Sequence, residues 1–272
     1  MKSTATPDEI VTLNDERGMQ SLLRQLGPGS PSQRAAVLLR HCSEPLLLCT
    51  GFPVAGSSET DGPVGAVVLA RALQRLNRTV SIVSWPEALR SWAELVRGID
   101  CIELRVGKQR SQRLYGKAIT IEACGRVEDG CYENLRGKNV ADQAPWFEDA
   151  IGDRALISIG DGGNEFGMGS APASWFDARQ VRQPISKCEA LVVGQVSNWA
   201  VLALVAALSR LIAINLLPDP AQYQAMLDVL AYKGVVDGVS GKPSATEDGF
   251  DHGEGPRILE RLHAWLAVAT AA

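Results

Sequence analysis

Six short apolar runs, separated by helical segments, constrain the fold of this chain more than any other feature. Each run has the length of a buried strand, and helical patterns fill the gaps between the early ones, at residues 62–77 and 86–98. Strands that alternate with helices are typical of α/β proteins. We therefore predict an α/β fold with a mainly parallel central sheet, flanked by helices on both faces in a Rossmann-like layering. The runs are PLLLCTG at 45–51, TVSIVSW at 79–85, IDCIELRVG at 99–107, KAITIEACG at 117–125, ALISIGDGG at 155–163 and EALVVGQ at 189–195.

Both ends of the chain show helical patterns. Residues 1–44 carry apolar residues at helical spacing, with a break from Gly27 to Pro31. No internal repeat and no long linker interrupts the chain. We predict a single α/β domain over residues 1–272, with residues 1–44 as an N-terminal helical segment. The C-terminal part predicts a long apolar helix at 197–218, a second helix at 221–234, a Gly- and Ser-rich connector at 235–250 and an amphipathic helix at 257–268.

Charge and hydropathy exclude several classes of function. Lys and Arg total 27 against 31 Asp and Glu, and no concentrated basic stretch is present, so we expect no nucleic-acid partner. Arg210 and Asn215 interrupt the apolar segment 197–218, so we expect a buried helix and no membrane insertion. Residues 1–18 lack the apolar core of a secretory signal. We expect a cytoplasmic protein, and assembly into a homo-oligomer is left open.

The cysteines and histidines indicate which chemistry is absent. The six cysteines form no C-x-x-C pair, and several lie beside apolar runs. This is typical of reduced, mostly buried thiols and not of a zinc site or a disulfide framework. His41, His252 and His263 lie outside the loops that follow the predicted strands. A His-based zinc site, a Ser-His-Asp triad and a Cys-His pair are therefore not expected, and the chemistry must come from carboxylates, amides, hydroxyls or backbone groups.

The loop after the first strand contains two acids. Ligands of open parallel sheets bind beyond the carboxyl ends of the strands, where this loop runs from Thr50 to Val67. Its ETDGP sequence makes Asp61 a candidate N-cap of the next helix, and the N–H groups of such a helix start suit a carboxylate or phosphate. Glu59 is either a solvated acid in a flexible loop or a functional group.

Glu122 interrupts the otherwise apolar strand ITIEAC. A carboxylate in such a run either lies on a wet face of the sheet or is paired with a cation. The loop behind it, residues 125–137, contains Asp129 and Gly130, which are standard residues of a tight turn. We therefore expect a hairpin or tight turn in that loop.

The third loop belongs to ISIGDGGNEFGMGS, residues 157–170. Its glycines let the backbone take positive φ and approach a ligand closely, while Asp161, Asn164 and Glu165 supply oxygen ligands just after the strand. The spacing fits neither the dinucleotide fingerprint, the P-loop, the G-x-S-x-G elbow nor the EF-hand. A metal-binding oxygen cluster or an amine-recognition site fits the composition best, and an ordinary Gly-rich turn is the alternative.

The fourth loop, GQVSNWA at 194–200, offers Ser197 or Asn198 as a cap for the long helix, and capping alone explains both residues. Taken together, the loops bring acids toward one edge of the sheet. Converging acids repel one another unless a cation lies between them. Oxygen-only ligands select Mg²⁺, Mn²⁺ or Ca²⁺ over zinc or copper.

Four segments in this order resemble the D-glutamate cyclase family, whose C-terminal domain also occurs as a stand-alone protein in microbes. The resemblance extends from about Leu46 to Ser209, with a weaker echo in residues 235–250. The chain departs from the family pattern in KCEALVV and at Ala200, where Gly commonly follows SNW. The segments are TGFPVAGSSETDGPVGAVVLARAL, IEACGRVEDGCYENLRG, ISIGDGGNEFGMGS and CEALVVGQVSNWA.

The resemblance implies a lyase that converts D-glutamate, an acidic amino acid, to 5-oxo-D-proline and water, assisted by a divalent metal, Mn²⁺ or Mg²⁺. On that basis we expect Asp161 or Glu165 to be the catalytic carboxylate, with Glu122 as a further candidate for the proton acceptor. The acids should meet at one end of the sheet. The expected metal ligands are Glu59, Asp61, Asp161 and Glu165, and the expected substrate contacts are Thr50, Gly51, Gly162, Gly163, Asn164, Ser197 and Asn198.

Two other functions share these loops. One is a protein that binds a metal or a small metabolite without turning it over, since the loops contain ligands but no clearly activated nucleophile. The other is a metal-dependent hydrolase of a phosphorylated or amino-dicarboxylate substrate. The GDGGNE turn contains no Lys or Arg, which argues against phosphate chemistry.

Overall fold

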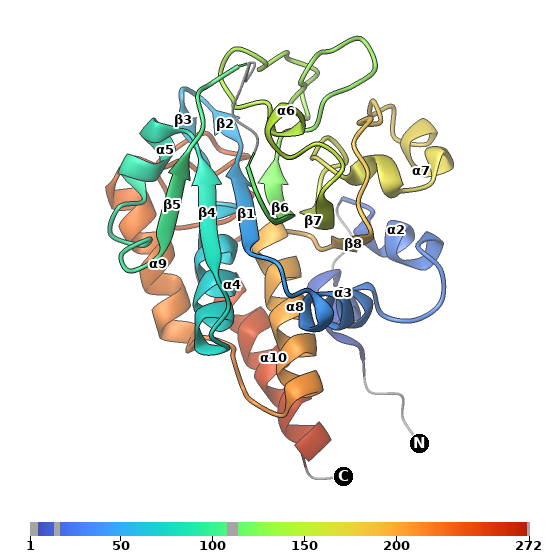
Figure 1. Ribbon diagram of the computed structural model, residues 1–272, viewed down its shortest axis with the longest axis vertical. Coiled ribbons are helices and arrows are strands. Elements are labelled where there is room, and N and C mark those ends of the chain that lie inside the picture. The colour runs from blue at the N-terminus through green and yellow to red at the C-terminus, as the bar shows by residue number, and fades with distance from the viewer. Residues whose placement is uncertain (1–4, 14–16, 108–113, 271–272) are drawn as a thin grey trace.

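The computed structural model describes residues 5–13, 17–107 and 114–270 (Figure 1). Six parallel strands form the central sheet, in the order β5-β4-β1-β6-β7-β8. Each predicted apolar run contains one of these strands, so the α/β fold with its parallel sheet is confirmed. A two-stranded hairpin, β2 (Pro53–Val54) and β3 (Ser57–Ser58), follows β1. The strands of the sheet are β1 Leu46–Gly51, β4 Val80–Ser84, β5 Asp100–Glu103, β6 Lys117–Ala123, β7 Ala155–Gly160 and β8 Ala190–Val193.

The strand order reverses between β1 and β6. The chain builds outward from β1 through β4 to β5, then returns to the other side of β1 and builds outward again through β6, β7 and β8. This is the order of a doubly wound sheet, and in such sheets the crevice at the reversal point is where ligands bind. Residues at the carboxyl ends of β1 and β6 are therefore the first place to look for a site.

Seven helices of the described chain, five of them long, cover one face of the sheet. The helix α8 (Ser197–Ile212) lies at its centre, and every residue from Ser197 to Ser209 is buried, because this segment is apolar on all sides. It packs against α3 and α4 on the sheet and against α1 and α10 on its outer side. The helices on this side are α1 Pro7–Val11, α3 Pro31–His41, α4 Pro63–Arg75, α5 Pro86–Ser91, α9 Pro220–Tyr232 and α10 Glu254–Thr270.

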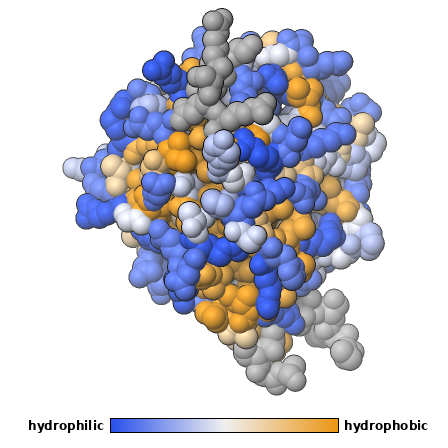
Figure 2. Space-filling view, in the orientation of Figure 1, coloured by the Kyte–Doolittle hydropathy of each residue, from blue (hydrophilic) through white to orange (hydrophobic). Residues whose placement is uncertain are grey.

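The opposite face is covered by short helices and loops. Phe147 and Ile151 from α6 (Phe147–Ile151) pack with Leu47 and Cys49 of β1. At the β8 edge, α2 (Met19–Gln25) and α7 (Ala173–Asp177) pack on the strand, and a 3-10 turn at Met168–Ser170 precedes α7. Figure 2 shows that apolar residues reach the surface in several places in this view. Helices flank both faces as predicted, although unevenly.

Several boundaries differ from the sequence prediction. The long helix ends at Ile212 and not at 218, because Ala213 adopts a left-handed φ of 57° and the Ser209 hydroxyl accepts a hydrogen bond from the Leu216 N–H. The helical segment predicted at 86–98 is α-helical only to Ser91. All six cysteines are free. Within the described ranges, no helix combines the length and the apolar character that crossing a membrane requires.

Candidate active site

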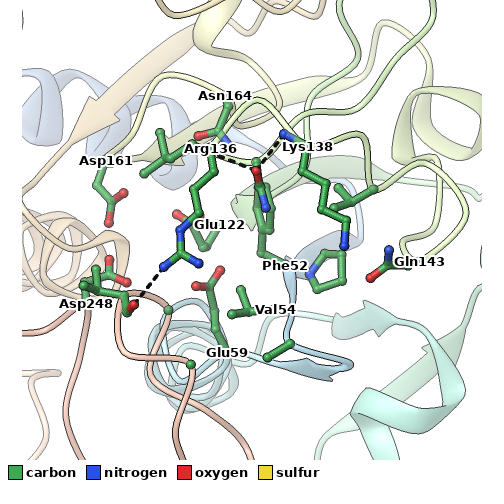
Figure 3. A pocket seen from close by; sticks show the side chains of 18 of the residues that line it. Phe52, Val54, Glu59, Glu122, Arg136, Lys138, Gln143, Asp161, Asn164 and Asp248 are labelled. Carbon is green, nitrogen blue, oxygen red and sulfur yellow. Dashed lines mark hydrogen bonds between the residues drawn. The ribbon is translucent and has the colours of Figure 1, made fainter.

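A cavity of about 300 Å³ opens at the carboxyl edge of the sheet, at the reversal point between β1 and β6 (Figure 3). Its lining comes from parts of the chain that are far apart in sequence: the N-terminal segment, the loop after β1, the end of β6, the β6–β7 loop, the loop after β7 and the α9–α10 connector. The charged residues in the lining are Arg17, Glu59, Glu122, Arg136, Lys138, Asp161 and Asp248.

Two helix starts behind the cavity exchange their caps. The Asp61 carboxylate accepts hydrogen bonds from the N–H groups of Ser197 (2.7 Å) and Asn198 (2.7 Å) at the start of α8. In return, the side-chain oxygen of Asn198 accepts from the N–H groups of Gly62 (3.0 Å) and Gly65 (2.7 Å) at the start of α4. This corrects two expectations: Asp61 caps α8 and not α4, and neither Ser197 nor Asn198 is the N-cap of α8, which begins after Val196.

Asp161 connects this pair of helices to the cavity. One of its carboxylate oxygens accepts from the Ser197 N–H at 3.0 Å, the same group that donates to Asp61. The other accepts from the Arg17 guanidinium at 2.7 Å. The loops after β1 and β7 thus meet, as the sequence predicted for their acids, although more than ninety residues separate them.

Glu165 stabilises its own loop by accepting hydrogen bonds from the backbone of that loop. Its two carboxylate oxygens accept from three backbone N–H groups, those of Asp161 (2.8 Å), Gly162 (2.5 Å) and Gly163 (2.7 Å). A hydrogen-bonded ring of this kind fixes the Gly-rich turn, and Gly163 contributes a φ of 102° that a side chain would oppose. Glu165 is completely buried and lies behind the cavity lining.

Glu122 is turned into the cavity by a distortion of β6. Its φ of 43° lies in the left-handed region, and the pairing between β1 and β6 shifts register at this point. Such irregularities re-aim a side chain and concentrate at functional sites. One carboxylate oxygen accepts from the Ser197 hydroxyl at 2.7 Å. Glu122 is therefore a buried cavity residue, so neither a wet sheet face nor a simple ion pair describes it.

Glu59 has a buried oxygen without a partner. Its Oε1 makes no hydrogen bond within the described part of the chain, and neither does the buried hydroxyl of Thr50. Burial raises the pKa of Glu59 well above its ordinary value, and the carboxylates of Asp248 and Asp61 raise it further. A buried carboxylate oxygen without a hydrogen-bond partner in a cavity wall is suited to act as a ligand atom.

Too many acids share this space for all of them to be charged. Burial is also the main cause that raises the pKa values of Asp61, Glu122 and Asp161, and neighbouring carboxylates add to it. Arg17 is paired with two of these acids: its guanidinium bridges Asp161 and Asp248 at 2.7 and 2.9 Å. Burial works against the charge of Arg17, but these carboxylates outweigh it and raise its pKa.

The donor set fits a hard divalent cation. The oxygens of Asp61, Asp161 and Asp248 come within 4.8 Å of one another, and so do those of Glu122, Asp161 and Glu165. Carboxylate-only ligation is what Mg²⁺ and Mn²⁺ accept, and the free Oε1 of Glu59 faces the same cavity. Of the four predicted ligands, Glu59 and Asp161 line the cavity, whereas Asp61 and Glu165 lie behind it.

The predicted substrate contacts mostly support the site from behind. Thr50, Gly51, Ser197 and Asn198 are buried outside the lining, and a side chain at Gly51 would collide with Trp85. Gly162 and Gly163 donate their N–H groups to Glu165. Among the expected contacts, the cavity lining contains Asn164, whose side chain holds the β6–β7 loop through the Glu133 carbonyl at 2.8 Å.

Sequence reasoning missed several residues of the site. Asp248 and its neighbour Glu247 lie in the connector where only a weak resemblance was seen, and Arg17 lies in the N-terminal segment. Arg136 and Lys138 follow the tight turn of the β6–β7 loop. Arg17, Arg136 and Lys138 are cations of the cavity lining. They weaken the argument against phosphate chemistry, because that argument considered only the absence of Lys and Arg from the GDGGNE turn.

Glu247 anchors the connector behind the site. Its carboxylate accepts from the Asn198 amide (2.9 Å), the Trp199 indole (3.0 Å) and the Tyr223 hydroxyl (2.5 Å). Burial raises the pKa of Glu247 to about 7, although these donors oppose the rise. The connector that carries Asp248 is thereby tied to the start of α8.

This arrangement defines a class: a doubly wound α/β protein with an acid-lined cavity at its reversal point. The family model described as "D-glutamate cyclase-like, C-terminal" matches residues 8–263, and the chain belongs to this family. It is 26% identical to human "D-glutamate cyclase, mitochondrial" over 292 aligned positions. That alignment covers 84% of this chain and 47% of the human protein, so the chain spans about half the length of that relative.

Proposed function

We propose that this protein is a lyase that converts D-glutamate to 5-oxo-D-proline and water in the acid-lined cavity. The observation that carries the proposal is the convergence of Glu59, Glu122 and Asp161, three buried carboxylates with raised pKa values, on one cavity in a member of this family. Raising the pKa of a carboxylate makes it a stronger proton acceptor. We also propose that the protein acts in the cytoplasm.

The reaction requires three events at one nitrogen and one carboxyl group. The α-ammonium loses a proton, the amine nitrogen forms a bond to the γ-carboxyl carbon, and one γ-oxygen leaves. The two protons that the nitrogen loses depart with that oxygen as water, so atoms and charge balance. Because both reacting groups belong to one molecule, a cavity that holds it folded supplies much of the rate enhancement.

Glu122 is our choice for the proton acceptor. One of its oxygens is oriented by the Ser197 hydroxyl, which leaves the other directed at the cavity. Asp161 would hold the substrate ammonium, because Arg17 and the start of α8 fix its carboxylate in place. Glu165 remains a candidate from the sequence, but its contacts favour a role in fixing the loop.

A divalent cation, Mn²⁺ or Mg²⁺, would be held by Glu59, Asp61, Asp161 and Asp248. When bound, it would make the γ-carboxyl group a better electrophile. The protein's own residues provide the remaining functions: they bind the ammonium, accept its proton and exclude bulk water from the buried floor of the cavity.

The test is to incubate the purified protein with D-glutamate, without metal and with Mn²⁺ or Mg²⁺, and to follow 5-oxo-D-proline by chiral chromatography. We expect product, and we expect less product from L-glutamate. Failure to form product with any metal would refute the lyase. Binding of D-glutamate without product would then indicate a metabolite-binding protein, and phosphate release from a general phosphomonoester would indicate a hydrolase.

A further inference from the structure

Backbone N–H groups at both helix starts and in the Gly-rich turn of this site already donate to oxygens of the protein. Among the described residues, the N–H groups at the start of α4 donate to Asn198, and those at the start of α8 donate to Asp61. The N–H groups of the Gly-rich turn donate to Glu165. Helix starts and glycine turns are common anion sites, but here the protein's own oxygens occupy them. The carboxylates of a substrate must find other partners.

Two cations face the acids from the opposite wall of the cavity. Arg136 and Lys138 lie on the β6–β7 loop, and Figure 3 shows the Arg136 side chain extending down into the cavity and the Lys138 side chain running along it toward Gln143. Arg17 is the third cation of the lining, but Asp161 and Asp248 already bind its guanidinium.

A second turn of the β6–β7 loop, residues 134–138, positions these two side chains. The side-chain oxygen of Asn134 accepts from the N–H groups of Arg136 and Lys138, each at 3.0 Å, and Gly137 between them has a left-handed φ of 70°. The residue before the turn, Glu133, offers its carbonyl to the Asn164 amide at 2.8 Å. The turn is thus fixed to the same loop that carries Asp161.

Among the described residues, neither cation has a carboxylate partner. The Arg136 guanidinium donates to the Val239 carbonyl at 3.2 Å, across the cavity on the α9–α10 connector. The Lys138 ammonium has no hydrogen bond or ion pair within the described part of the chain. A carboxylate is a stronger acceptor for a guanidinium than a neutral carbonyl is, and it can bind both prongs of the fork.

We propose that Arg136 and Lys138 are the specificity determinants of this site and that they bind the two carboxylates of an amino-dicarboxylate. The acidic wall takes the ammonium group, and the basic wall takes the carboxylates, with the planar fork of Arg136 holding one and Lys138 holding the other. This inference rests on the proposed function for the identity of the substrate. It explains how a cavity lined by acids can bind a ligand that carries two carboxylates.

Binding of D-glutamate to the Glu122→Gln variant tests the inference, because we expect this variant to bind substrate and to turn it over too slowly to disturb the measurement. We expect Arg136→Gln in that background to weaken binding about 10- to 100-fold, Lys138→Gln about 3- to 10-fold, and Arg136→Lys by an intermediate factor. Arg90→Gln is the matched control, since Arg90 is an exposed arginine paired with Glu87 away from the cavity. D-norvaline, which lacks the γ-carboxylate, should bind weakly to all these proteins. Titration calorimetry measures each affinity.

Unchanged affinity for D-glutamate in both Arg136→Gln and Lys138→Gln would overturn the inference. So would a wild-type kcat/KM in the corresponding single variants of the active enzyme. If the E122Q parent binds D-glutamate and the Arg136 and Lys138 variants do not, the inference holds even where the wild-type protein makes no product. Absence of product from the wild-type protein would refute only the proposed lyase. Should Arg136→Gln fail to fold, Arg136→Lys and Lys138→Gln decide the question.

Discussion

The two walls of the cavity are built differently. The acidic wall consists of Glu59, Glu122, Asp161 and Asp248. Glu122 lies near the end of β6, Glu59 and Asp161 lie in the loops after β1 and β7, and all three are buried. The basic wall consists of Arg136 and Lys138 on a loop, and both are exposed. Rigid strand ends can hold unfavourable charges in place, whereas a loop offers cations that keep their hydration until a ligand arrives. The buried charges of the acidic wall therefore lower the free energy of unfolding, whereas the exposed charges of the basic wall do not.

The largest effect should come from removing the proposed base. Glu122→Gln should lower kcat about 10³-fold, because general base catalysis contributes roughly 10² to 10⁴. The same change should raise the melting temperature at pH 8, since it removes a charge whose pKa is raised by burial and by Glu165 and Glu59. Activity assays and thermal unfolding measure the two effects. Glu128→Gln, an exposed change in the following loop, is the control; loss of stability in E122Q would indicate a structural role for Glu122 instead.

Glu247, which lies behind the acidic wall, should show the cost of a buried charge in the pH dependence of stability. The pKa of Glu247 rises from 4.5 to about 7 on folding. This group's contribution is fully present below pH 4.5 and is lost as the pH rises through 7, because the folded state binds the proton more tightly. At about 1.4 kcal/mol per pH unit, the loss amounts to about 3 kcal/mol.

Urea unfolding between pH 4.5 and 8 measures this loss. We expect the free energy of unfolding of the wild-type protein to decline over the range and that of Glu247→Gln to decline less. The metal-free protein should be used throughout. A wild-type profile that rises steadily to pH 8 would contradict the raised pKa of Glu247.

The same contrast explains how much of the molecule the sequence could predict. The six strands were readable because a strand buried on both faces needs a continuous apolar run, and the acids after β1 and β7 were readable because parallel strands end at one edge. Glu122 stood out as a charge inside such a run. These features depend on the sheet, which local pattern largely determines.

The remainder depends on contacts between distant loops. Nothing near Arg17 in sequence indicates that it pairs with Asp161 and Asp248, because that contact exists only after the N-terminal segment packs beside β8. The exchanged caps of α4 and α8 are equally non-local: Asp61 and Asn198 each look like an ordinary cap for their own helix. Local propensity correctly predicted that these residues accept hydrogen bonds from the N–H groups of a helix start, but it predicted the wrong helix for each.

Glu165 and Asp161 provide an intermediate test within one loop. Glu165→Gln should lower the free energy of unfolding by about 2 kcal/mol, because an amide replaces a carboxylate that accepts three backbone N–H groups. Its activity should fall only as far as the loop loses order. Asp161→Asn should do the opposite, with a large rise in KM for D-glutamate and little loss of stability. Equal effects of the two variants on kcat, without unfolding, would restore Glu165 as a catalytic candidate.

The smallest effect should come from the basic wall. Arg136→Gln and Lys138→Gln should each change the free energy of unfolding by less than about 0.5 kcal/mol, the usual range for exposed side chains, although we expect both to weaken substrate binding.

Arg17→Gln is the informative comparison, because Arg17 is a cation that lies beside the acidic wall and forms ion pairs with Asp161 and Asp248. It should cost about 1 to 2 kcal/mol at pH 8 and less at lower pH, because burial raises the pKa of Asp161 and this acid takes up a proton more readily as the pH falls. Urea unfolding of the three variants at pH 8 and at lower pH measures this difference. If Arg136→Gln destabilises the protein as much as Arg17→Gln does, the guanidinium of Arg136 is part of the folded scaffold, and the distinction between the two walls fails.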